Sequence, residues 1–253
     1  MKPKYEQAPF PWFGGKRRVA DIGWQAMGPE ADNYIEAFAG SLAMLLGRPG
    51  GAGKIETVND IDANIANFWR AVREDPTGVA AHCDWPVIEV DLHSRHDYLV
   101  KNLPKLREKI VADPGYFDSK IAGWWVWGIG LWIGSGWCAP TDDATTRQKP
   151  HISARGIHTA EPVTSRRKPT MGVEAWLVSL STRLRHVRVL SGDWLRVLTD
   201  SVLSAGNGIT AVFLDPPYEG FEYVYTREVE GDGWHDIGGG QPERQPRART
   251  HLV

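Results

Sequence analysis

The sequence predicts an α/β protein built around an open, mostly parallel β-sheet. Residues 33–75 are expected to form strand, turn, helix, strand and helix in that order, which is typical of parallel strands joined by helical crossovers. Two further apolar strands, at 187–194 and 211–218, each end close to an acidic residue. A stretch of different character, at 80–170, separates the two pairs of strands. The pattern therefore indicates one sheet assembled from both ends of the chain, with a module inserted between them.

Residues 16–27 have helical spacing, and the side expected to be apolar holds Val19, Ile22, Gly23 and Met27. Residues 33–38 form the first expected strand, and 39–47 form a small-residue turn that enters a helix. Residues 53–60 form the second strand. Residues 61–75 form an amphipathic helix, which Pro76 and Gly78 end. Its expected apolar face consists of Ile61, Ile65, Phe68, Trp69 and Val72.

The inserted stretch is expected to be mainly helical, with helices near 97–112 and 117–133. Five of the twelve tryptophans lie between Trp124 and Trp137. Such a cluster is typical of a buried helix or an aromatic satellite core, and the alternative is a surface that stacks bases. Residues 141–170 are polar with few large apolar side chains, so they are expected to form a long loop.

The composition is that of an ordinary soluble globular protein. Of 253 residues, 42% are apolar and 24% are charged, and the formal net charge is −2. Any binding to nucleic acid must therefore come from local basic patches. The two cysteines, Cys83 and Cys138, lack metal-ligand spacing, which predicts structural thiols, a cytoplasmic location and no bound metal. No signal peptide is visible and the apolar run at 122–134 is too short to span a bilayer, so no membrane partner is expected.

Acidic residues stand at or near the ends of the four expected strands, namely Glu36, Asp60, Asp193 and Asp215. In an open α/β sheet, ligands bind beyond the carboxyl ends of the strands, where the strand order reverses. Each acid taken alone could instead be a helix cap or a turn residue. Four of them at one edge, beside the small-residue turn at 38–41, favour a nucleoside ligand with hydroxyl groups and a positive centre.

The segment LDPPY, at 214–218, adds a specific chemical group to that edge. An ionised Asp215 accepts hydrogen bonds, and the prolines restrict the backbone so that the Pro216 carbonyl has a fixed direction. Two such acceptors suit the two hydrogens of an NH2 group, and Tyr218 can stack on a planar base. The alternative is an irregular turn that contains two prolines. We expect chemistry on the exocyclic amine of a nucleobase, which in a duplex must first be flipped out.

Four motifs in the same order resemble those of the Dam-type, alpha-group DNA adenine methyltransferases, which use S-adenosylmethionine. The segment PWFGGK at 11–16 resembles the N-terminal cofactor motif, and YIEAFAGS at 34–41 resembles the cofactor motif after the first strand. The segment NDID at 59–62 resembles the acidic end of the second strand, and LDPPY resembles the catalytic motif. The insert matches the target-recognition domain of the family in position.

The resemblance implies a Rossmann-like class I methyltransferase sheet at 1–80 and 171–228, with a mainly helical target-recognition insert at 81–170. It implies S-adenosylmethionine as cofactor, double-stranded DNA as partner, and methyl transfer to the N6 amine of a flipped-out adenine. The residues implied in catalysis are Asp215, Pro216, Pro217 and Tyr218. The residues implied in cofactor binding are Trp12, Gly14, Gly15, Lys16, Glu36, Phe38, Gly40, Asp60 and Asp193. Among these, Lys16 would contact the methionine end of the cofactor and Asp60 its ribose hydroxyls.

Other functions remain open on the sequence alone. The same fold could act on the cytosine N4 amine or on RNA, or the chain could be a DNA-binding relative with impaired catalysis. Asp rather than Ser before PPY favours adenine in this family, and the enzyme could be solitary or part of a restriction–modification pair. The loop at 144–170 has six basic residues and one acid, and we expect it to contact the DNA backbone, the alternative being a solvated loop. The basic residues are Arg147, Lys149, Arg155, Arg166, Arg167 and Lys168.

The catalytic strand is expected to lie near an open edge of the sheet. A methyltransferase sheet of this kind needs about three more strands after the catalytic motif, and 35 residues follow Tyr218. Residues 221–228 could form one strand or a loop, and 229–253 are expected to be a disordered tail. We therefore expect the chain to lack the C-terminal strands that the family has. We expect a partner chain or a further segment to complete the sheet, and reduced or absent activity of this chain alone.

Overall fold

The computed structural model describes residues 7–12, 14–132, 137–139, 149–151, 156–159, 172–206 and 208–216. Its strands form one four-stranded, all-parallel sheet in the order β3-β2-β1-β4. The strands are β1 (Asn33–Glu36), β2 (Ile55–Asp60), β3 (Val187–Ser191) and β4 (Thr210–Phe213). This arrangement confirms the predicted α/β class and the assembly of one sheet from both ends of the chain, and it is compatible with a Rossmann-like fold.

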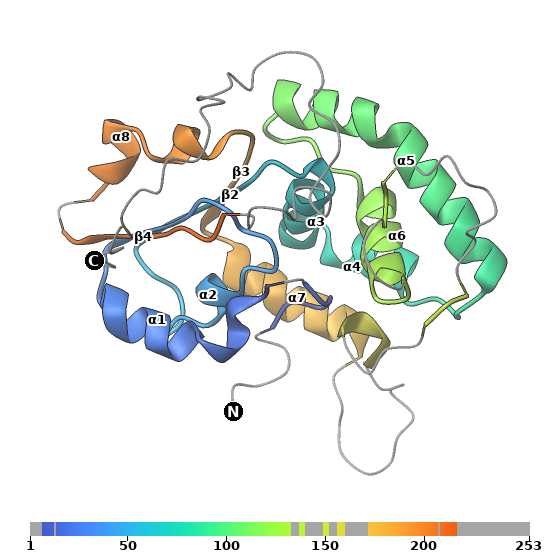
Figure 1. The fold of residues 1–253 in the computed structure, drawn as a ribbon, viewed down its shortest axis with the longest axis horizontal. Helices are drawn as coiled ribbons and strands as arrows, with labels where there is room; N and C mark the ends of the chain where they lie inside the picture. Colours follow the sequence, from blue (N-terminus) through green and yellow to red (C-terminus); the bar gives the residue numbers. More distant parts are fainter. Residues whose placement is uncertain are drawn as a thin grey trace, which may run out of the picture.

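Short helical segments flank the sheet, and longer helices extend beyond it. The short segments are the 3₁₀ turns η2 (Lys16–Arg18) and η4 (Trp194–Val197) and the helices α1 (Ala20–Met27), α2 (Ala43–Leu46) and α8 (Asp200–Leu203). The longer helices are α3 (Ala63–Glu74), α4 (Pro76–Cys83), α5 (Glu89–Ala112), α6 (Ser119–Ile129) and α7 (Val173–Leu184), with a 3₁₀ turn η3 (Gly156–Thr159) between the last two. Figure 1 shows α1 and α2 on one side of the sheet and α8 on the other.

The central strand β1 is buried on both faces. Successive side chains of a strand point to opposite faces, so Tyr34 and Ile35 enter different packing layers. The Tyr34 ring packs on Trp24 of α1, with ring centroids 4.7 Å apart. Ile35 packs on the other face in a cluster that includes Val197 of η4 and Val202 of α8. All four residues of β1 are buried, as is typical of a parallel strand covered by helices on both sides.

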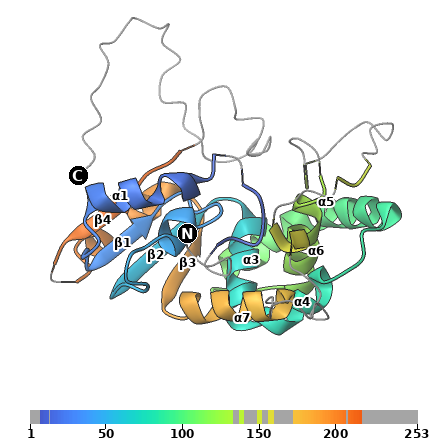
Figure 2. The same cartoon turned by 90° about the horizontal axis from the view of Figure 1, so that it is seen from below.

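The longer helices continue the core of the sheet. Helix α3 leads out of β2 and α7 leads into β3, and α4 packs against α6 and α7 while α6 packs against α3. Figure 2 shows α7 extending from the sheet to α4. One buried cluster includes Tyr34 and Val58 of the sheet together with Leu99 and Trp127 of the helices. The inserted helices therefore share a hydrophobic core with the sheet.

The buried side of α1 differs from the prediction. Met27 is buried as expected, but Ile22 is 67% exposed and Val19 is 44% exposed, so the placement of these two residues on the apolar side was wrong. Trp24 is buried instead, and its indole N–H donates to the Met44 carbonyl at 2.8 Å. The large indole ring with a satisfied donor, rather than the count of aliphatic residues, decides which side of the helix faces the core.

The end of α3 also differs in detail from the prediction. Pro76 ends α3 as expected, but it also begins α4, because proline is suited to the first turn of a helix, where its missing N–H is not needed. The Asp75 carboxylate caps this second helix by accepting from the Gly78 N–H at 2.9 Å. At the other end, Ile61 precedes the start of α3 and is 43% exposed, so its placement on the apolar face was wrong.

The tryptophan cluster contributes to the core. Trp125 and Trp127 of α6 are 2% and 0% exposed. The Arg95 guanidinium lies over the Trp127 ring, 4.1 Å from its centroid, which joins α5 to α6 through a cation–π contact. The prediction of a buried helix is confirmed for these two residues, and neither ring is available to stack a base.

The predictions of a basic loop and of a disordered tail concern residues that are mostly outside the described part of the chain. Most of the basic loop at 144–170 and all of the tail at 229–253 lie outside the described residues. Within the described part of the chain, no helix has both the length and the apolar composition that crossing a membrane requires.

A buried cluster of charges joins β2 to the helices beside it. Glu56 is 3% exposed and accepts two hydrogen bonds from Arg183 of α7, at 2.6 and 2.9 Å. Arg48 pairs with the same carboxylate at 3.3 Å, and Arg183 also donates to the Leu45 carbonyl. Removing the carboxylate would leave two guanidinium groups without their shared counter-ion, which is costly in a buried position.

We expect Glu56→Ala to lower the free energy of unfolding by about 3–5 kcal/mol, because it leaves a buried arginine unpaired. Urea unfolding followed by circular dichroism would measure the change. The matched control is Glu74→Ala, which breaks the more exposed pair with Arg73 and is expected to cost about 1 kcal/mol or less. Equal losses in the two variants would contradict the structural role of the Glu56 cluster.

Candidate functional site

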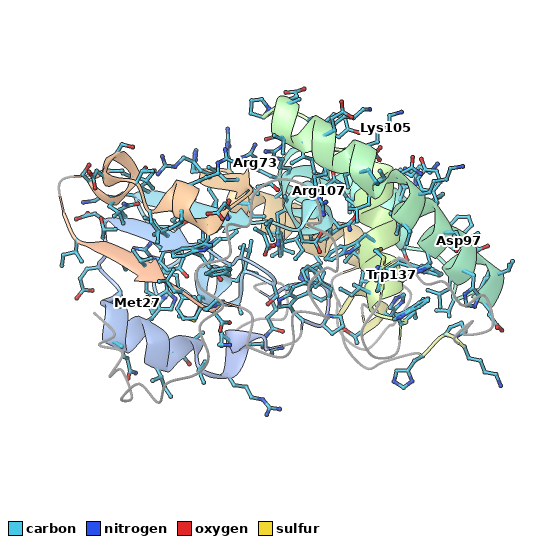
Figure 3. The ribbon with its side chains drawn as sticks, turned by 45° about the horizontal axis from the view of Figure 1, so that its top comes forward. Met27, Arg73, Asp97, Lys105, Arg107 and Trp137 are labelled. Carbon is cyan, nitrogen blue, oxygen red and sulfur yellow. The ribbon has the colours of Figure 1, made fainter. Side chains whose placement is uncertain are left out.

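The four strand-end acids lie at one edge of the sheet, as the sequence predicts. Glu36 ends β1 and Asp60 ends β2, while Asp193 and Asp215 each follow their strand by two residues. Since all four strands are parallel, their carboxyl ends share an edge. From β1 the chain adds β2 and then β3 on one side, and β4 later pairs with β1 on the other side. The strand order therefore reverses at β1, and open α/β sheets bind ligands at such a point. Figure 1 shows this edge directed toward α3 and the helices of the insert, and Figure 3 labels Arg107, which lies on α5.

Glu36 is a buried acid held by two donors. Its Oε2 accepts from the Tyr34 hydroxyl at 3.0 Å and from the Leu45 N–H at 3.1 Å. Burial raises the pKa of Glu36 from its usual 4.5 to about 8, and the charges of Asp215 and Asp60 act in the same direction. The sequence analysis missed Tyr34 as a partner. The signal was present, because residues two apart on a strand share a face.

Asp60 joins the turn after β1 to the turn after β2. Its Oδ2 accepts from the Gly40 N–H at 2.8 Å, and its Oδ1 accepts from the Asp62 N–H at 2.9 Å. Burial raises the pKa of Asp60 from its usual 3.8 to about 7, with a further contribution from the nearby Asp62 carboxylate. The acid therefore holds two backbone turns of the site in place, in addition to any contact that it makes with a ligand.

Gly40 permits a close approach by the N-terminal loop. Its φ of +44° lies in the left-handed region, and a Cβ there would stand 2.4 Å from Nε1 of Trp12. The Trp69 indole N–H donates to the Gly40 carbonyl at 2.9 Å from the other side. The turn after β1 is thus covered by Trp12, which the sequence analysis had assigned to the cofactor site. Gly15, in the same loop, donates its N–H to the Trp12 carbonyl at 3.2 Å.

Lys16 and Asp215 form an ion pair across the site. The Lys16 ammonium lies 2.7 Å from Oδ2 of Asp215, and it also donates to the Gly14 carbonyl at 2.9 Å. The two side chains are 21% and 25% exposed. Residues from opposite ends of the described chain therefore meet at the end of β4. The sequence analysis placed both residues in the site but did not predict their contact.

Asp193 and Phe38 have local partners at the same edge. Asp193 Oδ1 accepts from the Leu195 N–H at 2.8 Å and so caps the turn η4. This is the capping role that the sequence left open for each acid. The Phe38 ring lies beside Trp194, with ring centroids 5.9 Å apart. A ligand could contact only those parts of the two side chains that these local partners leave exposed.

Several predicted site residues fall outside the described part of the chain. Pro217 and Tyr218 of the catalytic motif are among them, as are the basic residues Arg147, Arg155, Arg166, Arg167 and Lys168. Pro216 is described and exposed, and so is Lys149. The stacking ring of the catalytic motif therefore stays a prediction.

The charges at this edge favour a cationic ligand. Three carboxyl groups, those of Glu36, Asp60 and Asp215, face one described ammonium, that of Lys16. An opposite charge nearby lowers the pKa of a carboxyl group, so a ligand with a positive centre would favour the ionised forms of Glu36 and Asp60.

The raised pKa of Glu36 makes stability depend on pH. Between pH 4.5 and 8 the folded chain retains a proton that the unfolded chain has released, so the free energy of unfolding falls as the pH rises through this window. We expect Glu36→Gln, which keeps an acceptor but cannot ionise, to reduce this fall by on the order of 1–3 kcal/mol. Urea unfolding at the two ends of the window would measure it, with the exposed Glu30→Gln as control. An unchanged pH dependence in Glu36→Gln would show that this carboxyl ionises normally.

The function proposed below rests on the fold, the geometry of the site and the motifs of the sequence. No model of a known protein family and no curated protein matches this chain.

Proposed function

We propose that the chain is an S-adenosylmethionine-dependent DNA methyltransferase that acts on the N6 amine of a flipped-out adenine. The position of Asp215 carries this proposal. It follows β4 by two residues, beside β1 at the reversal of strand order, and its Oδ2 lies 2.7 Å from the Lys16 ammonium of the N-terminal loop. The motif resemblance assigns these two residues to the target amine and to the cofactor, so their contact supports a single site for both.

The residues at the strand ends fit such a cofactor. Both hydrogen bonds of Glu36 to described residues fall on Oε2, which leaves Oε1 for a ligand. The Asp60 carboxylate accepts from the backbone N–H groups of Gly40 and Asp62, and its remaining acceptor capacity would suit a hydroxyl donor, as on a ribose. The donors and acceptors therefore suit a nucleoside with a positive centre better than a polyphosphate.

In this proposal the chain acts mainly by positioning. Asp215 and the Pro216 carbonyl accept the two hydrogens of the target amine, which directs the nitrogen lone pair at the methyl donor. Tyr218 stacks on the flipped base, and the proton lost by the amine passes to solvent. The cofactor, when bound, supplies a methyl group that its sulfonium has already activated. Proximity and alignment of the two reactants then account for most of the rate.

The sharpest test is replacement of Asp215. We expect Asp215→Ala to lower methyl transfer by at least about 10²-fold, because it removes one of the two groups that orient the amine. Transfer of a tritiated methyl group to unmethylated DNA, with nucleoside analysis, would measure the rate and identify the base. The control is Asp200→Ala in α8, whose exposed side chain lies away from the site and should leave the rate unchanged.

The outcomes separate the alternatives. Parental activity in Asp215→Ala would contradict the assignment of the site. Methylated cytosine would favour the N4 reaction, and methylated RNA would favour an RNA substrate. DNA binding without affinity for the cofactor would indicate a DNA-binding relative that has lost catalysis. Mapping modified bases in DNA from cells that express the chain would add the sequence context.

The basic loop provides a separate test of DNA binding. Neutralising Arg166, Arg167 and Lys168 together is expected to weaken binding for all sequences and to reduce the salt slope by roughly 2–3. Fluorescence anisotropy with labelled duplex at several salt concentrations would measure the slope. An affinity that does not respond to salt would contradict a role of this loop at the phosphate backbone.

A further inference from the structure

The ion pair with Lys16 occupies one carboxylate oxygen of Asp215, the group that would accept from the target amine. The ammonium lies 2.7 Å from Oδ2 of Asp215, while the Gly14 carbonyl accepts a second hydrogen at 2.9 Å. Gly14 has a φ of +69°, in the left-handed region that suits glycine, so a tight turn of the N-terminal loop returns its carbonyl to the Lys16 ammonium. Both side chains are largely shielded from solvent, which reduces screening of the pair.

A neutral amine is a weak competitor for this position. Hydrogen bonds between an ammonium and a carboxylate are roughly twice as strong as those between neutral groups. A nucleobase amine would therefore not displace Lys16 from Asp215 without help. A second anion that binds the ammonium would remove this obstacle.

The surrounding acids limit what that anion can be. Displacing Lys16 leaves Asp215 without this cation, beside the carboxyl group of Glu36, and a positive centre nearby would compensate for the loss. A ligand that carries both a carboxylate and a positive centre satisfies the two requirements together. A free amino-acid group attached to a sulfonium is such a ligand.

We propose that the Lys16–Asp215 pair makes target binding depend on the cofactor. The amino-acid carboxylate of the cofactor takes Lys16, and Asp215 then becomes available to the amine. This inference rests on the proposed function and adds an order of binding to it, in which the cofactor binds before the target base. Lys16 acts here as a positioning residue that withholds the acceptor until the methyl donor is present.

Two ligands that differ in the carboxylate test the proposal without DNA. S-adenosylhomocysteine has the amino-acid group, and 5′-methylthioadenosine lacks it. In the parent chain, Asp215 competes with the ligand carboxylate for Lys16. We expect Asp215→Asn to tighten binding of S-adenosylhomocysteine by at least about fivefold and to leave binding of 5′-methylthioadenosine unchanged. Isothermal titration calorimetry would measure both dissociation constants.

A double-mutant cycle with Lys16→Met isolates the pair. The effect of Asp215→Asn on S-adenosylhomocysteine binding should disappear when Lys16 is absent. The control Glu174→Gln neutralises an exposed acid on α7 and should change neither constant. Thermal unfolding of each variant verifies that it is folded, and the near-isosteric asparagine keeps the shape of the side chain.

The outcomes distinguish this inference from the proposed function. Binding of both ligands with no selective gain in Asp215→Asn overturns the competition and leaves the proposed function standing. A gain that persists in the Lys16→Met background overturns it as well. If the parent chain binds neither ligand, the proposed function fails and the inference fails with it.

Discussion

The site depends on the pairing of β1 with a parallel strand on each side. β2 and β4 both hydrogen-bond to β1, in registers that place Glu36 beside Val58 on one side and Phe213 on the other. This pairing brings the ends of three strands to one edge, although their sequences are far apart. Helices cover both faces of β1, so the strand cannot slip by a residue without moving its buried side chains to the wrong face. The positions of Glu36, Asp60 and Asp215 at the edge follow from this register.

The edge gathers carboxyl groups, and the fold accommodates each of them in a different way. Glu36 is buried and tends to keep its proton, as the rise in its pKa to about 8 indicates. Asp60 accepts two backbone N–H groups, and Asp215 pairs with Lys16. Each arrangement can respond to a cationic ligand, either by releasing a proton or by exchanging a partner. In the proposed function, these arrangements would suit the positive centre of the cofactor.

The inserted helices are bound into the sheet through α3 and α7. The chain leaves the sheet through α3 and returns to it through α7. One buried cluster includes both Tyr34 of the sheet and Trp127 of α6. The insert and the strand ends of the site are therefore packed on the same hydrophobic core. In the proposed function, this continuity would hold the DNA and the strand ends in a constant relation, because packed helices transmit displacement with little compliance.

The sequence by itself determined the fold class, the parallel strands and the edge at which the acids lie. Strand and helix periodicity is local, and the carboxyl ends of parallel strands must share an edge. Only the tertiary structure decided that β4 pairs with β1, that Trp24 rather than Ile22 faces the core, and that Lys16 meets Asp215. These outcomes depend on which distant surfaces pack and on which charges come within a few ångströms. Local spacing carries no information on such contacts, because they arise when segments remote in sequence compete for the same buried space.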